Sequence, residues 1–253
     1  MIIDQLKALW QCSFGDPEDS IDAFFSTAYS PARCQVLMQG DQVTSALYWL
    51  DTQYQGQKLA YLYAVATHPD FRGRGQCRCL MTHTKKLLKA RGYAGILLSP
   101  ASDGLRQMYG GMGYRDCCYC AKLSVPAAKE PAPLRMIGAD EYTRLRRQYL
   151  PEDGVVQEGE NVTYLKSFAS FYAGEDFLLV ATQEGTVLHG LELLWNRQAA
   201  GGIVKALSCT EGTFRTPGHD TMLAMFLPLK PSARPPGYLG FPFDYAYSIR
   251  PSR

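Results

Sequence analysis

The residues best suited to bind a ligand lie in the run Arg72-Gly-Arg-Gly-Gln-Cys-Arg78. Gly73 and Gly75 lack a Cβ, so the backbone there can adopt conformations and allow close ligand approach that other residues resist. Arg72 and Arg74 add positive charge to the same turn. Backbone amides and arginines together suit an anion, so this run predicts a phosphate-binding turn.

A helix is expected directly after this turn. Apolar residues recur at helical spacing from Leu80 to Leu88, and Gly92 provides a stop. A helix beginning near Gln76 would direct its unpaired N–H groups and the positive end of its dipole at the turn. Arg72 and Arg74 lie unfavourably at that positive end unless an anion is present, and this favours a phosphate ligand.

The other elements expected around this turn make a mixed α/β unit. The chain opens with a helix to about residue 12, and a second helix covers roughly Ser20 to Tyr29. Alternation and turn signals then predict a hairpin, a strand that leads into the turn, a short buried strand and a closing strand. These strands are expected at Cys34–Met38, Val43–Asp51, Lys58–Thr67, Gly95–Leu98 and Tyr119–Val125.

The run from Arg72 to Cys77 resembles the Arg/Gln-x-x-Gly-x-Gly/Ala pyrophosphate loop of the GNAT superfamily of acyl-CoA N-acyltransferases. Val65 to Phe71 resembles the strand end and lead-in of that family. Ser102 to Tyr114 resembles its second signature, in which a helix carrying a tyrosine runs into a Gly-aromatic pair. The resemblance implies the GNAT fold, an α/β architecture with a mixed sheet. It is strong over residues 60 to 115 and weak in the second half of the chain.

The same resemblance implies a binding site for acetyl-CoA. Backbone groups of Val65, Ala66 and Thr67 would pair with the pantetheine arm, and the amides from Gly73 to Arg78 would face the pyrophosphate. The cofactor-binding residues expected on this basis are Val65, Ala66, Thr67, Arg72, Gly73, Arg74, Gly75, Gln76, Cys77, Arg78 and Ser102.

The activity implied by the resemblance is transfer of an acetyl group from acetyl-CoA to a primary amine of a small molecule or peptide. The neutral amine attacks the thioester, and a backbone donor near Val65 holds the developing oxyanion. Tyr109 occupies the family's general-acid position, where a phenol with a pKa near 10 can protonate a thiolate of comparable basicity. A non-catalytic acyl-CoA sensor is the alternative function.

No general base stands out in the sequence. His68 is the nearest candidate, but its position before Pro69 favours a structural role in the turn. Asp244 and Tyr245 could reach the site if the C-terminal tail folds back, and a water relay is equally open. The amine substrate also stays undetermined, although the aromatic stretch from Tyr238 to Tyr247 could line a cation pocket or form a buried strand.

Two features depart from the family pattern. Cys77 stands where the family usually has glycine or alanine, and this affects the expected cofactor geometry mildly. The chain also begins directly with a helix, with Ile2, Leu6, Leu9 and Trp10 on one face, where the family usually has its first strand.

A proline- and alanine-rich segment at 127–133 predicts a linker between residues 1–126, the acetyltransferase domain, and residues 134–253. The second half resembles a degenerate GNAT-like repeat, with strands expected at Phe177–Thr182, Val187–Trp195 and Ile203–Cys209. Its Arg215-x-x-Gly218-x-Asp220 weakly resembles the pyrophosphate loop. Because Asp220 is anionic and Pro217 lacks an N–H, no cofactor is expected there, and a structural or substrate-lining role is favoured.

Composition limits the other classes of function. A net charge of +2 over 253 residues gives no indication of a nucleic-acid partner. No apolar run reaches the roughly 18 residues of a membrane helix, and no basic secretion signal opens the chain, so a cytoplasmic protein without a membrane partner is expected. Homo-oligomer formation is left open.

The eight cysteines do not indicate a metal site. Cys77 and Cys79 are two apart on a predicted helix and so do not share a face, and no histidine lies near the cluster Cys117, Cys118 and Cys120. A Rossmann or P-loop module is also disfavoured, because the glycines do not follow Gly-x-Gly-x-x-Gly and no Gly-Lys-Ser/Thr follows them.

Overall fold

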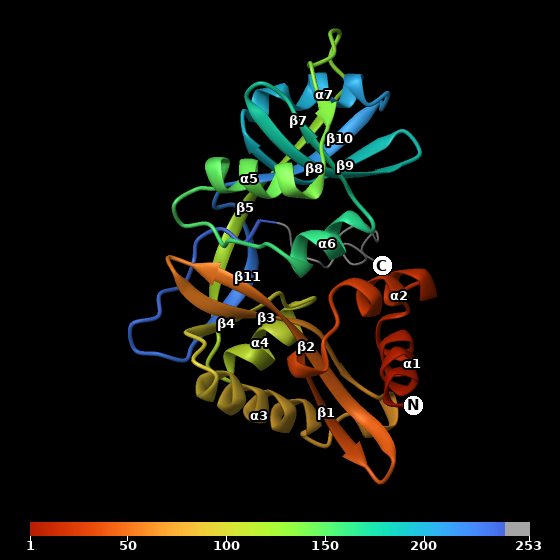
Figure 1. Ribbon diagram of the computed structural model, residues 1–253, viewed down its shortest axis with the longest axis vertical. Coiled ribbons are helices and arrows are strands. Elements are labelled where there is room, and N and C mark those ends of the chain that lie inside the picture. Colours follow the sequence, from red (N-terminus) through yellow and green to blue (C-terminus); the bar gives the residue numbers. More distant parts are fainter. Residues whose placement is uncertain (241–253) are drawn as a thin grey trace. The chain divides into compact units, whose positions relative to one another are not determined.

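The computed structural model describes residues 1–240, and its chain forms two compact units (Figure 1). The first unit contains Met1–Arg115 and Met225–Pro235. The second contains Asp116–Ala224 and, among the described residues, 236–240. Each unit has its own strands and helices, so each is described separately.

The sheet of the first unit has the strand order β1-β2-β3-β4-β11. All neighbours are antiparallel except β3 and β4, which are parallel and are joined through helix α3. A parallel pair needs such a crossover, because a short turn cannot return the chain to the same end of the sheet. The strands are β1 (Cys34–Gln39), β2 (Gln42–Tyr54), β3 (Gln57–Thr67), β4 (Gly95–Leu98) and the Met225–Pro228 part of β11 (Thr221–Pro228).

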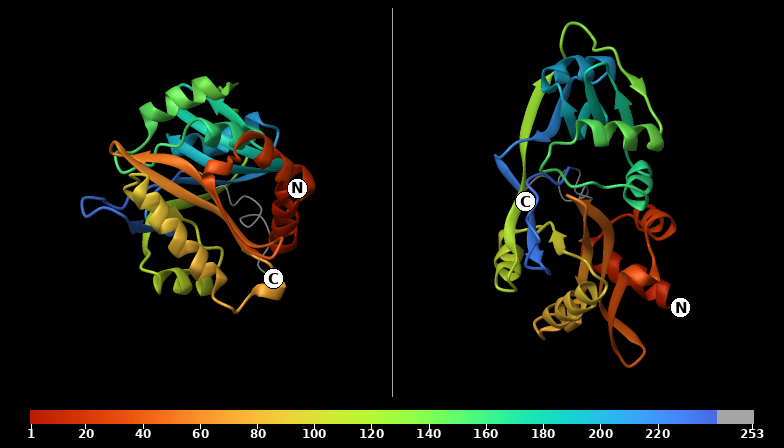
Figure 2. Two further views of the ribbon diagram at one scale, coloured as in Figure 1. Left: turned by 60° about the horizontal axis from the view of Figure 1, so that its bottom comes forward. Right: turned by 60° about the vertical axis from the view of Figure 1, so that its left-hand side comes forward.

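Helices cover both faces of this sheet: α3 (Gln76–Ala90) and α4 (Asp103–Gly110) lie on one face, and α1 (Ile2–Phe14) and α2 (Glu18–Thr27) on the other (Figures 1 and 2). Because side chains alternate along a strand, those of these strands pack into two cores, one on each face of the sheet. Trp49 and Leu62 pack with Leu80 of α3, whereas the ring of Tyr63 lies 5.5 Å from that of Trp10 on the opposite face. The early helix and the hairpin predicted from the sequence are confirmed.

The second unit repeats part of this topology. Its strand order is β5-β10-β9-β8-β7-β6, and only β9 and β10 are parallel. Helix α7 connects these two, as α3 connects β3 and β4. The elements are β5 (Arg115–Pro126), β6 (Arg135–Met136), α5 (Ala139–Tyr149), α6 (Glu160–Lys166), β7 (Ser170–Ala173), β8 (Phe177–Glu184), β9 (Val187–Trp195), α7 (Ala200–Ala206) and β10 (Glu211–Pro217).

Two expectations for this unit were wrong. The strand predicted at Ile203–Cys209 is largely helix α7, in which Ala200, Ile203 and Val204 have helical spacing and are buried in the core. The β-branched pair Ile203-Val204 favoured a strand, but tertiary packing overrode that propensity.

The weak loop resemblance at Arg215–Asp220 was also misplaced. It falls at the end of β10 and in the turn before β11, so no helix follows it. The position that corresponds to the glycine turn of the first unit is 196–199, directly before α7, and it contains no glycine.

The segment at 127–133 lies inside the second unit. It joins β5 to β6, and its backbone is tied to helix α7, since Ala128 N donates to Gly201 O and Ala132 N donates to Gly202 O, both at 2.9 Å. A Cβ on Gly202 would meet Ala132 at 2.9 Å, which explains glycine at this close approach. Strand β5, assigned to the first domain from the sequence, contributes all residues after Arg115 to the second unit.

A buried ion pair stabilises the second unit. Arg146 of α5 donates from Nε to Glu192 Oε2 at 2.8 Å and from Nη2 to Glu192 Oε1 at 3.0 Å. Tyr142 OH donates to the same carboxylate at 2.6 Å, and Tyr238 OH at 3.3 Å. Burial, and next the Glu192 carboxylate, raise the pKa of both phenols well above its usual value, so they stay protonated donors.

Candidate functional site

A pocket of about 620 Å³ lies in the first unit at the end of β3. Its walls come from the end of α1, the end of β3, the turn that follows, the start of α3, and α4 with the residues after it. The lining residues are Ser13, Phe14, Val65, Thr67, Phe71, Arg72, Gly73, Gly75, Gln76, Cys77, Arg78, Leu105, Met108, Tyr109 and Met112. Segments far apart in the sequence therefore meet here.

A β-bulge turns the end of β3 toward this pocket. Ala66 pairs with Ala46 and Tyr63 with Tyr48, so two residues of β3, Ala64 and Val65, oppose a single residue of β2. Ala64 adopts φ +46°, which is unusual for a residue with a Cβ. The extra residue shifts the alternation by one position, so Val65 packs on the face covered by α3, while Tyr63 points to α1 and α2.

Strand β4, the neighbour of β3 on the side away from β2, stops pairing with β3 shortly before the bulge. β3 and β4 pair only over Leu59–Tyr61 and Gly95–Leu97. Beyond Tyr61 the two parallel strands have no residues in register, so Ala64 and Val65 lie outside regular pairing on both sides. Backbone N–H and C=O groups that a sheet does not use are available to a ligand.

The glycine turn leads directly into α3. Gly73 and Gly75 have φ values of +74° and +76°, and Gly75 is the N-cap of the helix. No side chain caps this N-terminus. The first N–H groups of α3 therefore stay unpaired at the end of the helix that lines the pocket. A Cβ on either glycine would meet nothing within 4 Å, so backbone conformation and not lack of space requires glycine there.

Three arginines surround this helix N-terminus. Arg72 Nε donates to Thr67 O at 3.1 Å, and the guanidinium of Arg74 lies 5.3 Å from the centre of the Phe71 ring. Arg78 lies in the first turn of α3 and lines the pocket. Positive side chains at the positive end of a helix dipole repel it, and an anion at this place removes the conflict.

A buried hydroxyl ties the end of β3 to the start of α3. Ser45 of β2 is fully buried, and its Oγ lies 3.0 Å from Thr67 Oγ1 and 2.9 Å from Gln76 Oε1. Ser45 has one proton, which it donates to Gln76, and Thr67 then donates to Ser45. Thr67 and Gln76 both line the pocket, so this chain of hydrogen bonds sets the spacing of its two walls.

Tyr109 lies on α4 and lines the pocket. It is 6% exposed, and its ring meets that of Tyr114 edge to face with centres 5.9 Å apart. Burial, followed by the effect of Tyr109, raises the pKa of Tyr114 well above its usual value. Tyr114 does not line the pocket, so of these two phenols only Tyr109 is positioned to meet a ligand there.

Cys77 lines the pocket from the second position of α3. Its side chain is half-buried and packs at the edge of the core between α3 and α4. Burial raises the pKa of its thiol more than nearby Arg78 lowers it, so the thiol stays protonated at neutral pH. It therefore narrows the pocket as an apolar group would.

The structure gathers most, but not all, of the residues expected from the sequence. Val65, Thr67, Arg72, Gly73, Gly75, Gln76, Cys77, Arg78 and Tyr109 line the pocket. Ala66 is buried in the sheet, Arg74 stacks on Phe71, and Ser102 is exposed as the N-cap of α4, where its Oγ accepts from Leu105 N at 3.3 Å. These three residues do not line it. Asp244 and Tyr245 lie outside the described residues.

Sequence reasoning missed the apolar half of the pocket. Ser13 and Phe14 come from the last turn of α1, which ends at Gly15 in the left-handed conformation. Phe71, Leu105, Met108 and Met112 complete the wall. The Phe14-Gly15 helix stop was a signal for where α1 ends, but nothing in the sequence indicated that this end meets the turn after β3.

The strand order, the splay after Tyr61 and the glycine turn define the fold class of the acyl-CoA N-acyltransferases. Residues 2–117 match the family model of the acetyltransferase (GNAT) domain. This match supports acyl transfer in general. A comparison with curated proteins gives no match.

Solved structures share the fold over most of the chain. A GCN5-related N-acetyltransferase from Anabaena variabilis has a TM-score of 0.73 at 16% identity, covering 90% of this chain and 70% of that one. A GCN5-related N-acetyltransferase from Kribbella flavida has a TM-score of 0.66 at 17% identity, covering 88% of this chain and 68% of that one. A tandem GNAT protein from the clavulanic acid biosynthesis pathway has a TM-score of 0.53 at 14% identity, covering 91% of this chain and 96% of that one.

Within residues 1–240 no group of three or more His, Cys, Asp or Glu side chains is arranged to hold a metal ion. No helix in that same part of the chain is long and apolar enough to cross a membrane.

Proposed function

We propose that the protein is an N-acetyltransferase that moves an acetyl group from acetyl-CoA to a primary amine of a small molecule or peptide. The observation that carries the proposal is that Tyr109 lines the same pocket as the glycine turn and the N-terminus of α3. The glycine turn and the helix N-terminus suit an anion, and Tyr109 is a weak acid that lines the same pocket. We place this activity in the cytoplasm, and we assign the second unit a structural or substrate-lining role.

The pocket residues suit coenzyme A because its anionic and thioester groups have separate partners. Gly73, Gly75 and the first turn of α3 bind the pyrophosphate through backbone N–H groups, and Arg72 and Arg78 neutralise it. The cosubstrate supplies the activated acyl group as a thioester. The backbone at Val65, which the bulge removes from regular pairing, donates to the carbonyl oxygen as negative charge develops. Tyr109 then gives its proton to the departing thiolate.

Isothermal titration with acetyl-CoA tests the first half of this proposal. We expect a one-to-one complex with the full chain. If millimolar acetyl-CoA gives no heat, both proposed functions, acetyl transfer and non-catalytic acyl-CoA sensing, are refuted. If acetyl-CoA binds, thiol release measured across aminoglycosides, polyamines and peptide N-termini separates the two, because a sensor gives no amine-dependent release with any acceptor.

Gly75→Val should weaken acetyl-CoA binding by about tenfold or more. Valine resists φ +76°, so the turn must change, and one or two charge-assisted hydrogen bonds of about 1.5–3 kcal/mol each are lost. Gly56→Val is the matched control, because Gly56 has φ +73°, has equally open space where a Cβ would lie, and sits in the β2–β3 turn away from the pocket. Equal affinities of the two variants in titration would refute the pyrophosphate position.

Ser45→Ala should lower acetyl-CoA affinity by about fivefold and stability by about 1–3 kcal/mol, because Thr67 and Gln76 lose the hydroxyl that joins them. Thr44→Val serves as control. Thr44 is equally buried, and its Oγ1 donates to Leu37 O at 3.3 Å, which is outside the pocket. We expect this variant to lose stability in urea but to keep its affinity. If both variants bind acetyl-CoA like the parent protein, Ser45 does not position the site.

A further inference from the structure

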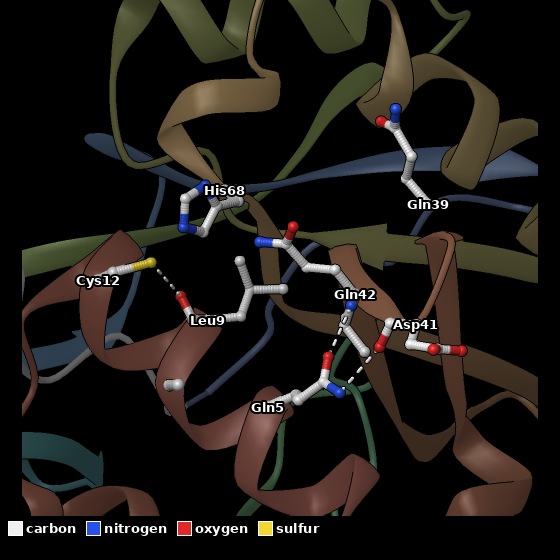
Figure 3. A pocket seen from close by; sticks show the side chains of 9 residues that line it. Gln5, Leu9, Cys12, Gln39, Asp41, Gln42 and His68 are labelled. Carbon is white, nitrogen blue, oxygen red and sulfur yellow. Dashed lines mark hydrogen bonds between the residues drawn. The ribbon is translucent and has the colours of Figure 1, made fainter.

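A second pocket of about 680 Å³ lies in the first unit, on the side of helix α1 (Figure 3). It shares no residue with the pocket described above, but the two have adjoining walls. Cys12 lines the second pocket and Ser13 the first, and likewise His68 lines the second and Thr67 the first. The lining residues are Gln5, Ala8, Leu9, Cys12, Gln39, Asp41, Gln42, Val43 and His68.

Hydrogen bonds hold the frame of this pocket in place. Gln5 of α1 donates from Nε2 to Asp41 O at 2.9 Å and accepts from Val43 N at 2.8 Å, so the β1–β2 turn is fastened to the helix. His68 N donates to Thr44 O at 2.9 Å. A pocket whose walls are already fixed loses little conformational entropy when a ligand binds.

Four polar groups of the pocket have no hydrogen-bond partner within residues 1–240: the amides of Gln39 and Gln42, the Asp41 carboxylate and Nε2 of His68. In Figure 3 the Gln42 amide extends past Leu9 toward the His68 ring. Because His68 Nδ1 accepts from Asp70 N at 3.3 Å, the neutral ring carries its proton on Nε2 and donates there. Gln42 and His68 together therefore offer three N–H donors, two on the amide and one on the ring, and one acceptor above the apolar surface of Ala8 and Leu9.

We propose that this pocket binds an adenine base. A glutamine amide makes two hydrogen bonds with adenine, because Oε1 accepts from the exocyclic amino group and Nε2 donates to a ring nitrogen. Ala8 and Leu9 provide an apolar surface for the face of the ring. A phosphate does not suit the same place, since the exposed Asp41 carboxylate at the rim would repel it. An adenine base fits the amide and the apolar surface, and it avoids repulsion by Asp41 when its phosphates lie outside this pocket.

The adenine can come from two sources, which the experiment separates. It can belong to the coenzyme, whose pyrophosphate the proposed function places at the neighbouring glycine turn, or to a separate adenine nucleotide. The first source rests on the proposed function and the second does not. The probes are adenosine, coenzyme A and 4′-phosphopantetheine, which lacks the adenosine part.

Gln42→Leu tests the site, with Gln53→Leu as matched control. Both glutamines are exposed on β2, but Gln53 lies at its far end, paired with Lys58. We expect Gln42→Leu to weaken adenosine binding on the order of tenfold in calorimetric titration, in line with a lost bidentate base contact. Gln53→Leu should bind like the parent protein.

The pattern across the probes identifies the source. If the coenzyme's own adenine occupies the pocket, Gln42→Leu weakens coenzyme A by the same factor, leaves 4′-phosphopantetheine unchanged, and coenzyme A displaces adenosine. If the nucleotide is separate, adenosine binds with undiminished affinity to protein saturated with coenzyme A. The inference is overturned if the parent protein gives no heat with millimolar adenosine, or if Gln42→Leu binds adenosine as the parent does. Loss of 4′-phosphopantetheine binding by the parent protein would instead count against the proposed function.

Discussion

Tyr109→Phe should lower the rate of acetyl transfer at neutral pH by about 10²–10⁴-fold, which is the usual contribution of a positioned general acid. Its acetyl-CoA affinity should stay the same, because only the hydroxyl is removed. The phenyl ring keeps its edge-to-face contact with Tyr114 and its buried place on α4, so the fold should be unaffected. Initial rates of thiol release, with titration of acetyl-CoA alongside, measure the two effects separately.

Tyr114→Phe is the control for this variant. Tyr114 is even less exposed than Tyr109, and burial raises the pKa of its phenol, so it is a poor proton donor and lies outside the pocket. Its loss should change the rate little. Unchanged turnover of Tyr109→Phe, or equal losses for the two variants, would remove Tyr109 from the chemistry and leave it a packing residue.

Glu192→Gln should destabilise the second unit by about 3–5 kcal/mol, since it leaves the Arg146 guanidinium buried without a counter-charge. Burial by itself lowers the pKa of Arg146, but the Glu192 carboxylate outweighs it and raises that pKa, so the arginine is charged throughout the accessible pH range. Tyr142 and Tyr238 lose a charged acceptor in the same step. The shift of the urea midpoint, followed by circular dichroism, measures the loss.

An exposed ion pair of the same unit provides the comparison. Arg135 and Glu141 form a bidentate contact at 2.9 and 2.7 Å, but their side chains are 60% and 33% exposed. Glu141→Gln should therefore cost less than about 1 kcal/mol. Combining Glu192→Gln with Arg146→Met should recover part of the loss, because no lone buried charge remains. If Glu192→Gln costs no more than Glu141→Gln, the buried network does not stabilise the unit.

The glycine turn is the part of the site that sequence reasoning predicted best. The conformational freedom of Gly73 and Gly75 and the dipole of the helix after them are local properties, so a strand, a turn and a helix start at Gln76 could be expected from neighbouring residues alone. The second unit shows the limit of such reasoning. Apolar residues at Ile203–Val204 fit a strand and a helix equally well over a short run, and only packing in the core selected α7.

The bulge at Ala64 could not be predicted, because it arises from how two strands pair. Nothing in the local sequence shows that β3 gains one residue opposite Leu47, yet this shift turns Val65 and Thr67 toward α3 and not toward α1. The buried hydroxyl of Ser45 is a similar case. It lies 31 positions from Gln76 in the chain, and only the folded sheet brings the two together.

The sequence by itself determined the residues that can bind an anion and the local elements that carry them, because glycine conformation, helix termini and apolar spacing act over a few positions. Only the tertiary structure decided which of those residues share a pocket. It brought the end of α1 to the glycine turn, left Ala66, Arg74 and Ser102 outside, and set a second pocket beside the first. Such placements depend on strand register and on packing between distant segments, which no short stretch of sequence encodes.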